Sequence, residues 1–146
     1  MKGNIRKLSL FLTVLYLLLL SYWMMYGFGR SPQEEYMYSL QPFSTIHHYL
    51  QIENFNTNTR VINLIGNIGV FIPFGVLLPV VIQRRFIIIY IIFFCGLFFL
   101  ELMQLLSKRG SFDVDDFILN SLGFMIGYWI YRIIALKVYS RRGGIA

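Results

Sequence analysis

Six acidic or amide side chains between positions 101 and 120 are the residues of this sequence best suited to chemistry. They are Glu101, Gln104, Asp113, Asp115, Asp116 and Asn120. Carboxylates can transfer protons or hold a hard cation, and amides can fix a polar ligand through hydrogen bonds. Glu101 lies inside a strongly apolar run, where a charge costs about 3 kcal/mol on insertion scales. Such a residue normally faces a protein interior or a wet cavity, so the elements that position it have to be identified.

The composition indicates a membrane protein. The chain has 146 residues, of which 57% are hydrophobic and 14% charged, and its mean hydropathy is +0.62. This is more apolar than a soluble domain of that length can hide in one core. Four runs are long enough to cross about 30 Å of hydrocarbon, namely residues 8–26, 61–82, 86–106 and 116–136. We therefore predict an all-α membrane protein, a compact bundle of four transmembrane helices forming one domain over 1–146.

The first run, 8–26, follows Lys2, Arg6 and Lys7, as the apolar region of a secretory signal would. It is longer than such a region, and no small-x-small cleavage site follows it. An uncleaved anchor is therefore favoured over a cleaved signal.

The long connection at residues 27–60 is expected to carry short interfacial helices. Ser31-Pro-Gln-Glu34 combines an N-cap serine, a proline at the first helical position and a glutamate at the third, which predicts a helix through Tyr38. Ser44–Phe55 mixes apolar and polar residues and could lie in the membrane interface as an amphipathic turn or two.

The distribution of basic residues predicts that both termini are cytoplasmic. Nine of the thirteen basic residues then fall on that side: Lys2, Arg6, Lys7, Arg84, Arg85, Arg132, Lys137, Arg141 and Arg142. All seven acidic residues lie on or toward the outer side. The basic balance thus reflects topology and contact with anionic lipids, and we expect no nucleic-acid partner.

The polar residues should converge at one depth of the outer leaflet. At ~1.5 Å per residue, Glu101 lies roughly 8–9 Å below the outer end of its helix, and Asn67 and Asn120 lie at a similar depth in theirs. Glu101 and Asp116 are the candidate catalytic residues. The candidate ligand-binding residues are Arg60, Asn63, Asn67, Gln104, Arg109, Asp113, Asp115 and Asn120. Glu101 is then either a neutral acid or a carboxylate paired with Arg60 or Arg109.

Structural explanations remain open for most of this cluster. The amides could be interhelical hydrogen bonds worth about 1 kcal/mol each, and the aspartates could cap the last helix. We assign no metal site, but a divalent cation at Glu101 and the Asp113–Asp116 turn is possible. Gly66, Gly69, Gly123 and Gly127 are expected to permit close helix contact, and Pro73 to kink the second helix.

The ordered motifs resemble the VanZ-like family of small bacterial membrane proteins. They are Asn63-Leu-Ile-Gly-Asn67, Phe71-Ile-Pro-Phe-Gly75, Glu101-Leu-Met-Gln104, Arg109-Gly-Ser-Phe-Asp113-Val-Asp115-Asp116 and Asn120-Ser-Leu-Gly123. Ser39-Leu-Gln-Pro42-Phe43-Ser-Thr-Ile46 is similar to the family's Asn-Leu-x-Pro-Phe-x-x-Ile element, with serine in place of asparagine. The resemblance runs from about Arg30 to Ile130. It implies a multi-pass protein of the bacterial cytoplasmic membrane, whose namesake is associated with teicoplanin resistance.

Three classes of function stay open. The polar site could bind a cell-envelope amphiphile, either a lipid-linked cell-wall precursor or a lipoglycopeptide, with membrane lipids around it. It could be an enzyme that uses Glu101 as general acid or base. Alternatively, the chain is a non-catalytic interaction or assembly subunit whose polar cluster only fixes helix packing. The sequence leaves the ligand, the reaction and the oligomeric state undetermined.

The topology can be tested by cysteine labelling. We predict that the variant Ser111→Cys reacts with a membrane-impermeant maleimide in intact cells, because the basic residues place the 107–116 turn outside. The unsubstituted chain, with its single Cys95, gives the background. Labelling of Ser111→Cys only after the inner face is exposed would contradict both the orientation and the outer location of the site.

Overall fold

Four long helices dominate the computed structural model, which describes residues 2–27, 30–51 and 57–143. The side chains of residues 2, 48–51, 57–63, 139 and 141–143 lie outside this description. The elements are α1 (Lys2–Tyr26), β1 (Met37–Ser39), α2 (Ser44–Gln51), α3 (Thr57–Ile82), α4 (Phe86–Leu106), β2 (Ser111–Asp113) and α5 (Val114–Gly143). Helices α1, α3, α4 and α5 are each long and apolar enough to span a membrane. The predicted all-α bundle of four such helices is confirmed.

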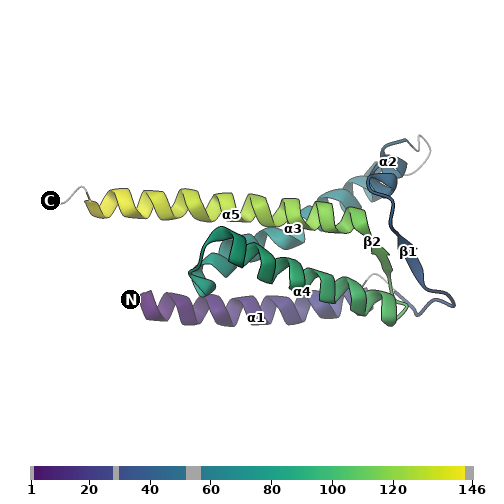
Figure 1. Cartoon of the computed structure of the whole chain (residues 1–146), viewed down its shortest axis with the longest axis horizontal. Coiled ribbons are helices and arrows are strands. Elements are labelled where there is room, and N and C mark those ends of the chain that lie inside the picture. The colour runs from purple at the N-terminus through teal and green to yellow at the C-terminus, as the bar shows by residue number, and fades with distance from the viewer. Residues whose placement is uncertain (1, 28–29, 52–56, 144–146) are drawn as a thin grey trace.

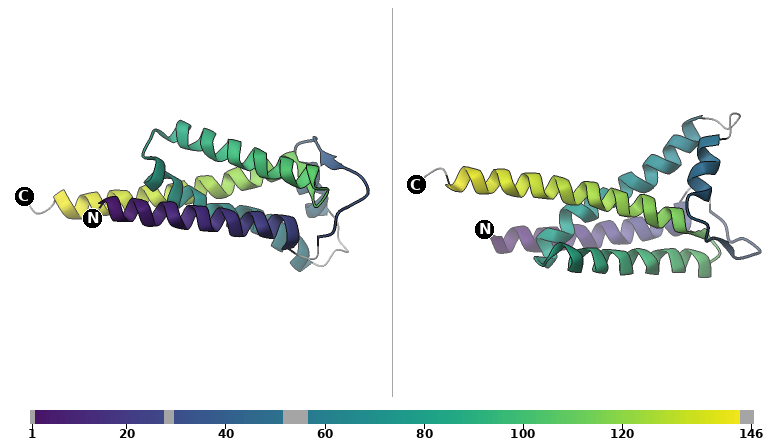
Figure 2. Two further views of the ribbon diagram at one scale, coloured as in Figure 1. Left: turned by 90° about the horizontal axis from the view of Figure 1, so that it is seen from below. Right: turned by 45° about the horizontal axis from the view of Figure 1, so that its top comes forward.

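The two ends of the bundle have different characters. Figure 1 shows both chain termini at one end and α2, β1 and β2 at the other, and the views in Figure 2 agree. Helix α3 crosses the other long helices obliquely (Figure 2). We call the end that holds the termini and the Gln83–Arg85 turn the terminal end. The end that holds β1, α2 and β2 is the loop end.

The core of the bundle is aromatic. Phe93 of α4 and Phe124 of α5 stack with their ring centroids 4.3 Å apart. The buried residues packed together here are Leu20, Phe71, Phe74, Ile89, Phe93, Leu97 and Phe124. They come from all four long helices, so α1 is part of the core although most of its leucines are exposed. The Tyr16 hydroxyl also ties α1 to α3 by donating to the Val70 carbonyl at 2.8 Å.

Helices α3 and α5 make the most extensive helix contact, and glycines permit it. A Cβ at Gly123 would overlap the carbonyl oxygen of Ile68, and one at Gly127 would overlap that of Ile72. Small residues on α5 therefore bring the two backbones together.

The glycine that faces α5 from α3 is Gly75, which packs against the backbone of residues 124–128. The expectation that Gly66 and Gly69 line this contact is wrong, because nothing lies within 4 Å of a Cβ built at either position. Ile68, Ile72 and Gly75 share the face of α3 that meets α5, whereas Gly66 and Gly69 lie in the same stretch on other faces of the helix.

The loop end departs from the sequence prediction in one segment. Residues 31–36 form no helix, and Met37–Ser39 pairs in parallel with Ser111–Asp113, Met37 opposite Ser111. The Gln33 N–H donates to the Lys108 carbonyl at 2.9 Å. This pairing with the turn after α4 overrides the local helix-start signal. The second interfacial helix does form as α2, and residues 52–56 of the predicted segment lie outside the described residues.

The α3–α5 contact generates a stability prediction. Gly123→Ala should lower the free energy of unfolding by about 1–3 kcal/mol, because its methyl group would have to displace the α3 backbone. Thermal unfolding in detergent measures the loss. The matched control is Gly66→Ala, which has open space and gains helix propensity, so we expect it to be neutral or slightly stabilising. Equal losses for both variants would contradict this packing.

Candidate functional site at the loop end

Asp115 fixes α2 onto the bundle. Its side chain is fully buried, and its Oδ1 accepts a hydrogen bond from the Phe43 N–H at 2.5 Å. Its Oδ2 accepts from the N–H groups of Thr45 and Ile46 at 2.8 and 3.0 Å. The first N–H groups of a helix have no partner within it, and a negative charge there is stabilising. These contacts give Asp115 a role in holding the loop that precedes α2.

Asp113 joins the same arrangement from the start of α5. Its Oδ1 accepts from the Asp115 N–H at 2.9 Å, so Asp113 caps α5. Its Oδ2 accepts from the Thr45 hydroxyl at 2.5 Å. All four oxygens of Asp113 and Asp115 therefore have donors from this chain.

Two residues at the loop end, one before α2 and one after α4, have left-handed backbone conformations. Phe43 has φ 63° and Lys108 has φ 54°, which cost about 1–2 kcal/mol in residues other than glycine. The Phe43 N–H is bonded to Asp115. Lys108 donates from its Nζ to the Glu34 carbonyl at 2.7 Å. Asp115 of α5 thus holds the loop at Phe43, and the Lys108 side chain ties the turn after α4 to the loop at Glu34.

Asp116 and Asn120 face the interior one turn apart on α5. The Asn67 Nδ2 of α3 donates to Asp116 Oδ1 at 2.6 Å, which links two of the helices predicted to converge. Asn120 is 2% exposed, and its Oδ1 has no hydrogen-bond partner among the described residues. A buried acceptor left unpaired costs about 1–3 kcal/mol.

Glu101 of α4 is the second unpaired acceptor. It is 1% exposed, and its Oε2 has no hydrogen-bond partner in the part of the chain that is described. Asp116 and Asp113 are close enough to repel its negative charge, and Arg30 is close enough to attract it. Gln104, one turn further on, is also buried and donates to the Met24 carbonyl of α1 at 3.0 Å.

A polar cavity of about 240 Å³ opens at the loop end beside this cluster. It is lined by Arg30, Gln33, Met37, Gln104, Arg109, Gly110, Ser111 and Asp116. The structure therefore brings together three residues of the predicted site, Gln104, Arg109 and Asp116, in the lining of one cavity. Arg109 is steadied there, since its guanidinium lies 4.5 Å from the centre of the Tyr26 ring and donates to the Arg30 carbonyl at 3.2 Å.

Arg30 is the functional candidate that sequence reasoning missed. Its Nη1 donates to the Met24 carbonyl at 2.9 Å, which places the guanidinium over the end of α1. The only sequence signal is its position just after the first apolar run, at the same membrane level as Arg109. Arg60 and Asn63 are in helix α3, but their side chains lie outside the described residues, so their predicted roles stay predictions.

The described residues contain no group of three or more His, Cys, Asp or Glu arranged to hold a metal ion. Asp113 and Asp115 already accept hydrogen bonds with every oxygen. Glu101 Oε2 and Asn120 Oδ1 would instead be satisfied by a donor from a ligand, such as a hydroxyl, an ammonium or a bound water.

The family model described as VanZ/LLP1 matches residues 10–135 of this chain. The chain belongs to the VanZ/LLP1 family. The match runs from within α1 to within α5 and so includes every residue of the loop-end site. No curated protein and no solved structure matches the chain. The VanZ-like resemblance drawn from the motifs is confirmed.

The role of Asp115 can be tested by hydrogen exchange. In Asp115→Asn, a side-chain NH₂ group replaces one of the two oxygens that accept hydrogen bonds. The negative charge at the start of α2 is also lost. We expect backbone N–H groups of residues 43–46 to exchange roughly ten times faster or more, since a hydrogen bond to a charged group is worth about 1.5–3 kcal/mol. Glu34→Gln, an exposed carboxylate of the same loop, is the control. Unchanged protection in Asp115→Asn would show that the loop is held by other contacts.

Proposed function

We propose that this VanZ-like protein binds the polar headgroup of an amphiphilic cell-envelope molecule at the loop end. The binding would take place in the outer leaflet of the bacterial cytoplasmic membrane and contribute to teicoplanin-type resistance. The observation that carries the proposal is a polar cavity lined by Gln104 and Asp116, each one helical turn from a buried acceptor, Glu101 Oε2 or Asn120 Oδ1, that lacks a partner within the described chain.

The lining of the cavity suits a headgroup with both anionic and hydrogen-bond donor groups. Arg30 and Arg109 supply guanidinium groups, which pair with phosphate or carboxylate oxygens. Asp116 in the same lining accepts hydrogen bonds and would meet hydroxyl or amine groups, and Glu101 and Asn120, with their unpaired oxygens, are each one helical turn from a lining residue, Gln104 or Asp116. Lipid-linked cell-wall precursors and lipoglycopeptides both present this combination.

An apolar hollow near the cluster could receive a hydrocarbon tail. It measures about 200 Å³ and lies between α1, α3 and α4. Its lining includes Phe71 and Phe74 of α3 and extends to Leu100, the residue before Glu101. A lipid-facing apolar hollow next to a polar cavity fits an amphiphile better than a small soluble ligand.

The arrangement of the ends supports an outer location for the site. Both termini lie at one end of the bundle (Figure 1), so the basic residues of the N- and C-terminal segments gather there. Cytoplasmic ends of membrane proteins are enriched in lysine and arginine. The loop end, with the acidic residues, would then face outward.

One observation also favours a catalytic role for the same site. The carboxylates of Glu101 and Asp116 are close enough to repel each other and come from two different helices. Two neighbouring carboxylates can divide the roles of general acid and base. In that case the bound headgroup would be a substrate, with Glu101 and Asp116 transferring protons.

Resistance measurements test the proposal. Expressed in a teicoplanin-susceptible bacterium, the unsubstituted protein should raise the minimum inhibitory concentration, and Glu101→Gln should remove the increase. Glutamine keeps the shape of the side chain but cannot carry the charge or transfer the proton. Glu35→Gln, in the exposed part of the loop, should retain the full effect.

Protein level and thermal stability must be measured alongside. A stable, well-expressed Glu101→Gln that keeps full resistance would falsify the proposed site. If Glu101→Gln instead lowers the protein level in proportion to resistance, the cluster serves packing, as expected of a non-catalytic assembly subunit.

A further inference from the structure

Two hollows at the terminal end meet at the same three residues of α5. The larger, about 680 Å³, has a mixed lining in which the polar residues include Gln83, Arg84 and Arg132. The smaller, about 380 Å³, is lined by Phe86, Met125, Trp129, Ile133 and others and is almost entirely apolar. Tyr128, Arg132 and Leu136 line both. We call the pair the terminal groove.

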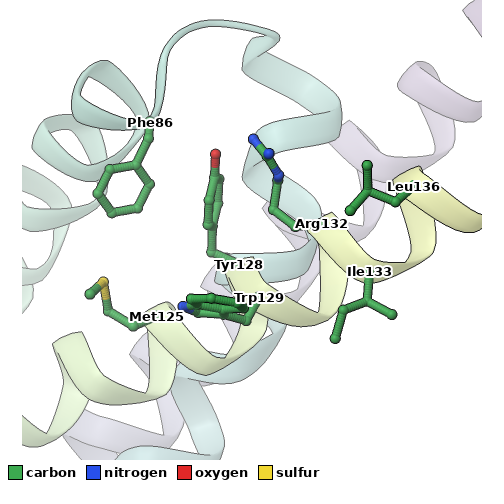
Figure 3. Close-up of a pocket in the computed structure, with 7 residues that line it drawn as sticks. All are labelled: Phe86, Met125, Tyr128, Trp129, Arg132, Ile133 and Leu136. Atoms are coloured by element: carbon green, nitrogen blue, oxygen red, sulfur yellow. The ribbon is translucent and has the colours of Figure 1, made fainter.

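Figure 3 shows how these side chains are arranged. Phe86, Tyr128 and Arg132 stand in a row, with the Tyr128 hydroxyl on the same side as the Arg132 guanidinium. The Phe86 and Tyr128 rings are 4.7 Å apart between centroids, which fixes the row. Met125, Trp129 and Ile133 lie on the other side of it in this view (Figure 3). The polar tips of Tyr128 and Arg132 therefore lie together on one side of the groove, and Met125, Trp129 and Ile133 lie on the other.

The two arginines of the groove have no anionic partner in the described chain. Neither Arg84 nor Arg132 forms an ion pair or a hydrogen bond with a described residue. The acidic residues that the structure describes all lie in the loop or toward the loop end, at Glu34, Glu35, Glu101, Asp113, Asp115 and Asp116. No described residue supplies a counter-charge to these two arginines, so an external anion can pair with them.

The position of Arg132 along its candidate span indicates which anions its guanidinium can reach. It lies inside the candidate span Val114–Val138, six residues before its end, or roughly 9 Å at ~1.5 Å per residue. An arginine at this depth extends its guanidinium toward the membrane interface, where lipid phosphates lie. The apolar half of the groove lies beside it, and Trp129 is 69% exposed there.

We propose that the terminal groove is a binding site for one anionic phospholipid. Arg84 and Arg132 pair with its phosphate, the Tyr128 hydroxyl donates a further hydrogen bond, and an acyl chain lies along Met125, Trp129 and Ile133. Basic pockets between membrane helices bind anionic headgroups in this way. The site is separate from the loop-end cavity and does not depend on the function proposed for it.

Quenching of Trp129 by brominated lipids tests the proposal directly. The chain has two tryptophans, so Trp23→Phe leaves Trp129 as the sole tryptophan, which is excited selectively over the tyrosines. The full-length protein is reconstituted in phosphatidylcholine vesicles, and dibrominated phosphatidylglycerol or dibrominated phosphatidylcholine is titrated in. We expect phosphatidylglycerol to quench at lower mole fraction, and Arg84→Gln and Arg132→Gln each to reduce this preference roughly fivefold.

The matched control is Arg85→Gln, which removes the same charge from the same turn but does not line the groove. Arg85→Gln should keep the same preference for phosphatidylglycerol over phosphatidylcholine as the unsubstituted protein. Arg132→Lys, which keeps the charge, should retain most of the preference and provides a folded reference if Arg132→Gln is unstable. Equal quenching by the two lipids in the unsubstituted chain, or an equal loss in Arg85→Gln, would overturn the proposal.

A soluble headgroup separates lipid binding from phosphate binding. sn-Glycerol 3-phosphate has the phosphate but no acyl chain, so it should leave the quenching by phosphatidylglycerol unchanged. Recovery of Trp129 fluorescence on its addition would show that the groove binds free phosphate, and the assignment to a phospholipid would then be wrong.

Discussion

A carboxylate removed from water needs hydrogen-bond donors, and the loop end of this protein is organised around that requirement. Asp115 is fully buried and meets it with three backbone N–H groups at and before the start of α2. Those N–H groups have no partners within α2. The Asp115 side chain of α5 therefore supplies their acceptors, and they supply the donors that the buried carboxylate needs. The loop before α2 is thereby tied to α5, the helix that makes the main contact with α3.

The cavity follows from this attachment. Once α2 is held by Asp115 and β1 pairs with β2, the segment that carries Arg30 and Gln33 lies against the turn after α4. Glu101 and Asn120 differ from the other buried polar residues because each keeps an oxygen without a donor. The fold therefore uses Asp113 and Asp115 to build the site and leaves Glu101 and Asn120 with unmet hydrogen-bonding capacity beside it.

The parts of this structure that depend on local rules could be predicted from the sequence. Apolar length sets the four helices. The parts that depend on pairing between distant segments could not. The helix-start signal at Ser31 was overridden by β1–β2 pairing, and Gly75 replaced Gly66 in the helix contact because Gly66 lies on another face of α3. Arg30 was missed since only the folded loop brings it near Glu101.

The central claim is that the loop-end cluster is a ligand site and more than a device for packing. A mass-spectrometric inventory of the lipids and amphiphiles that copurify with the protein tests it most directly, comparing the unsubstituted chain with Glu101→Gln. We expect at least one amphiphile to be retained by the unsubstituted protein and depleted in Glu101→Gln, with bulk phospholipid equal in both. Identical inventories from two equally stable proteins would contradict the claim.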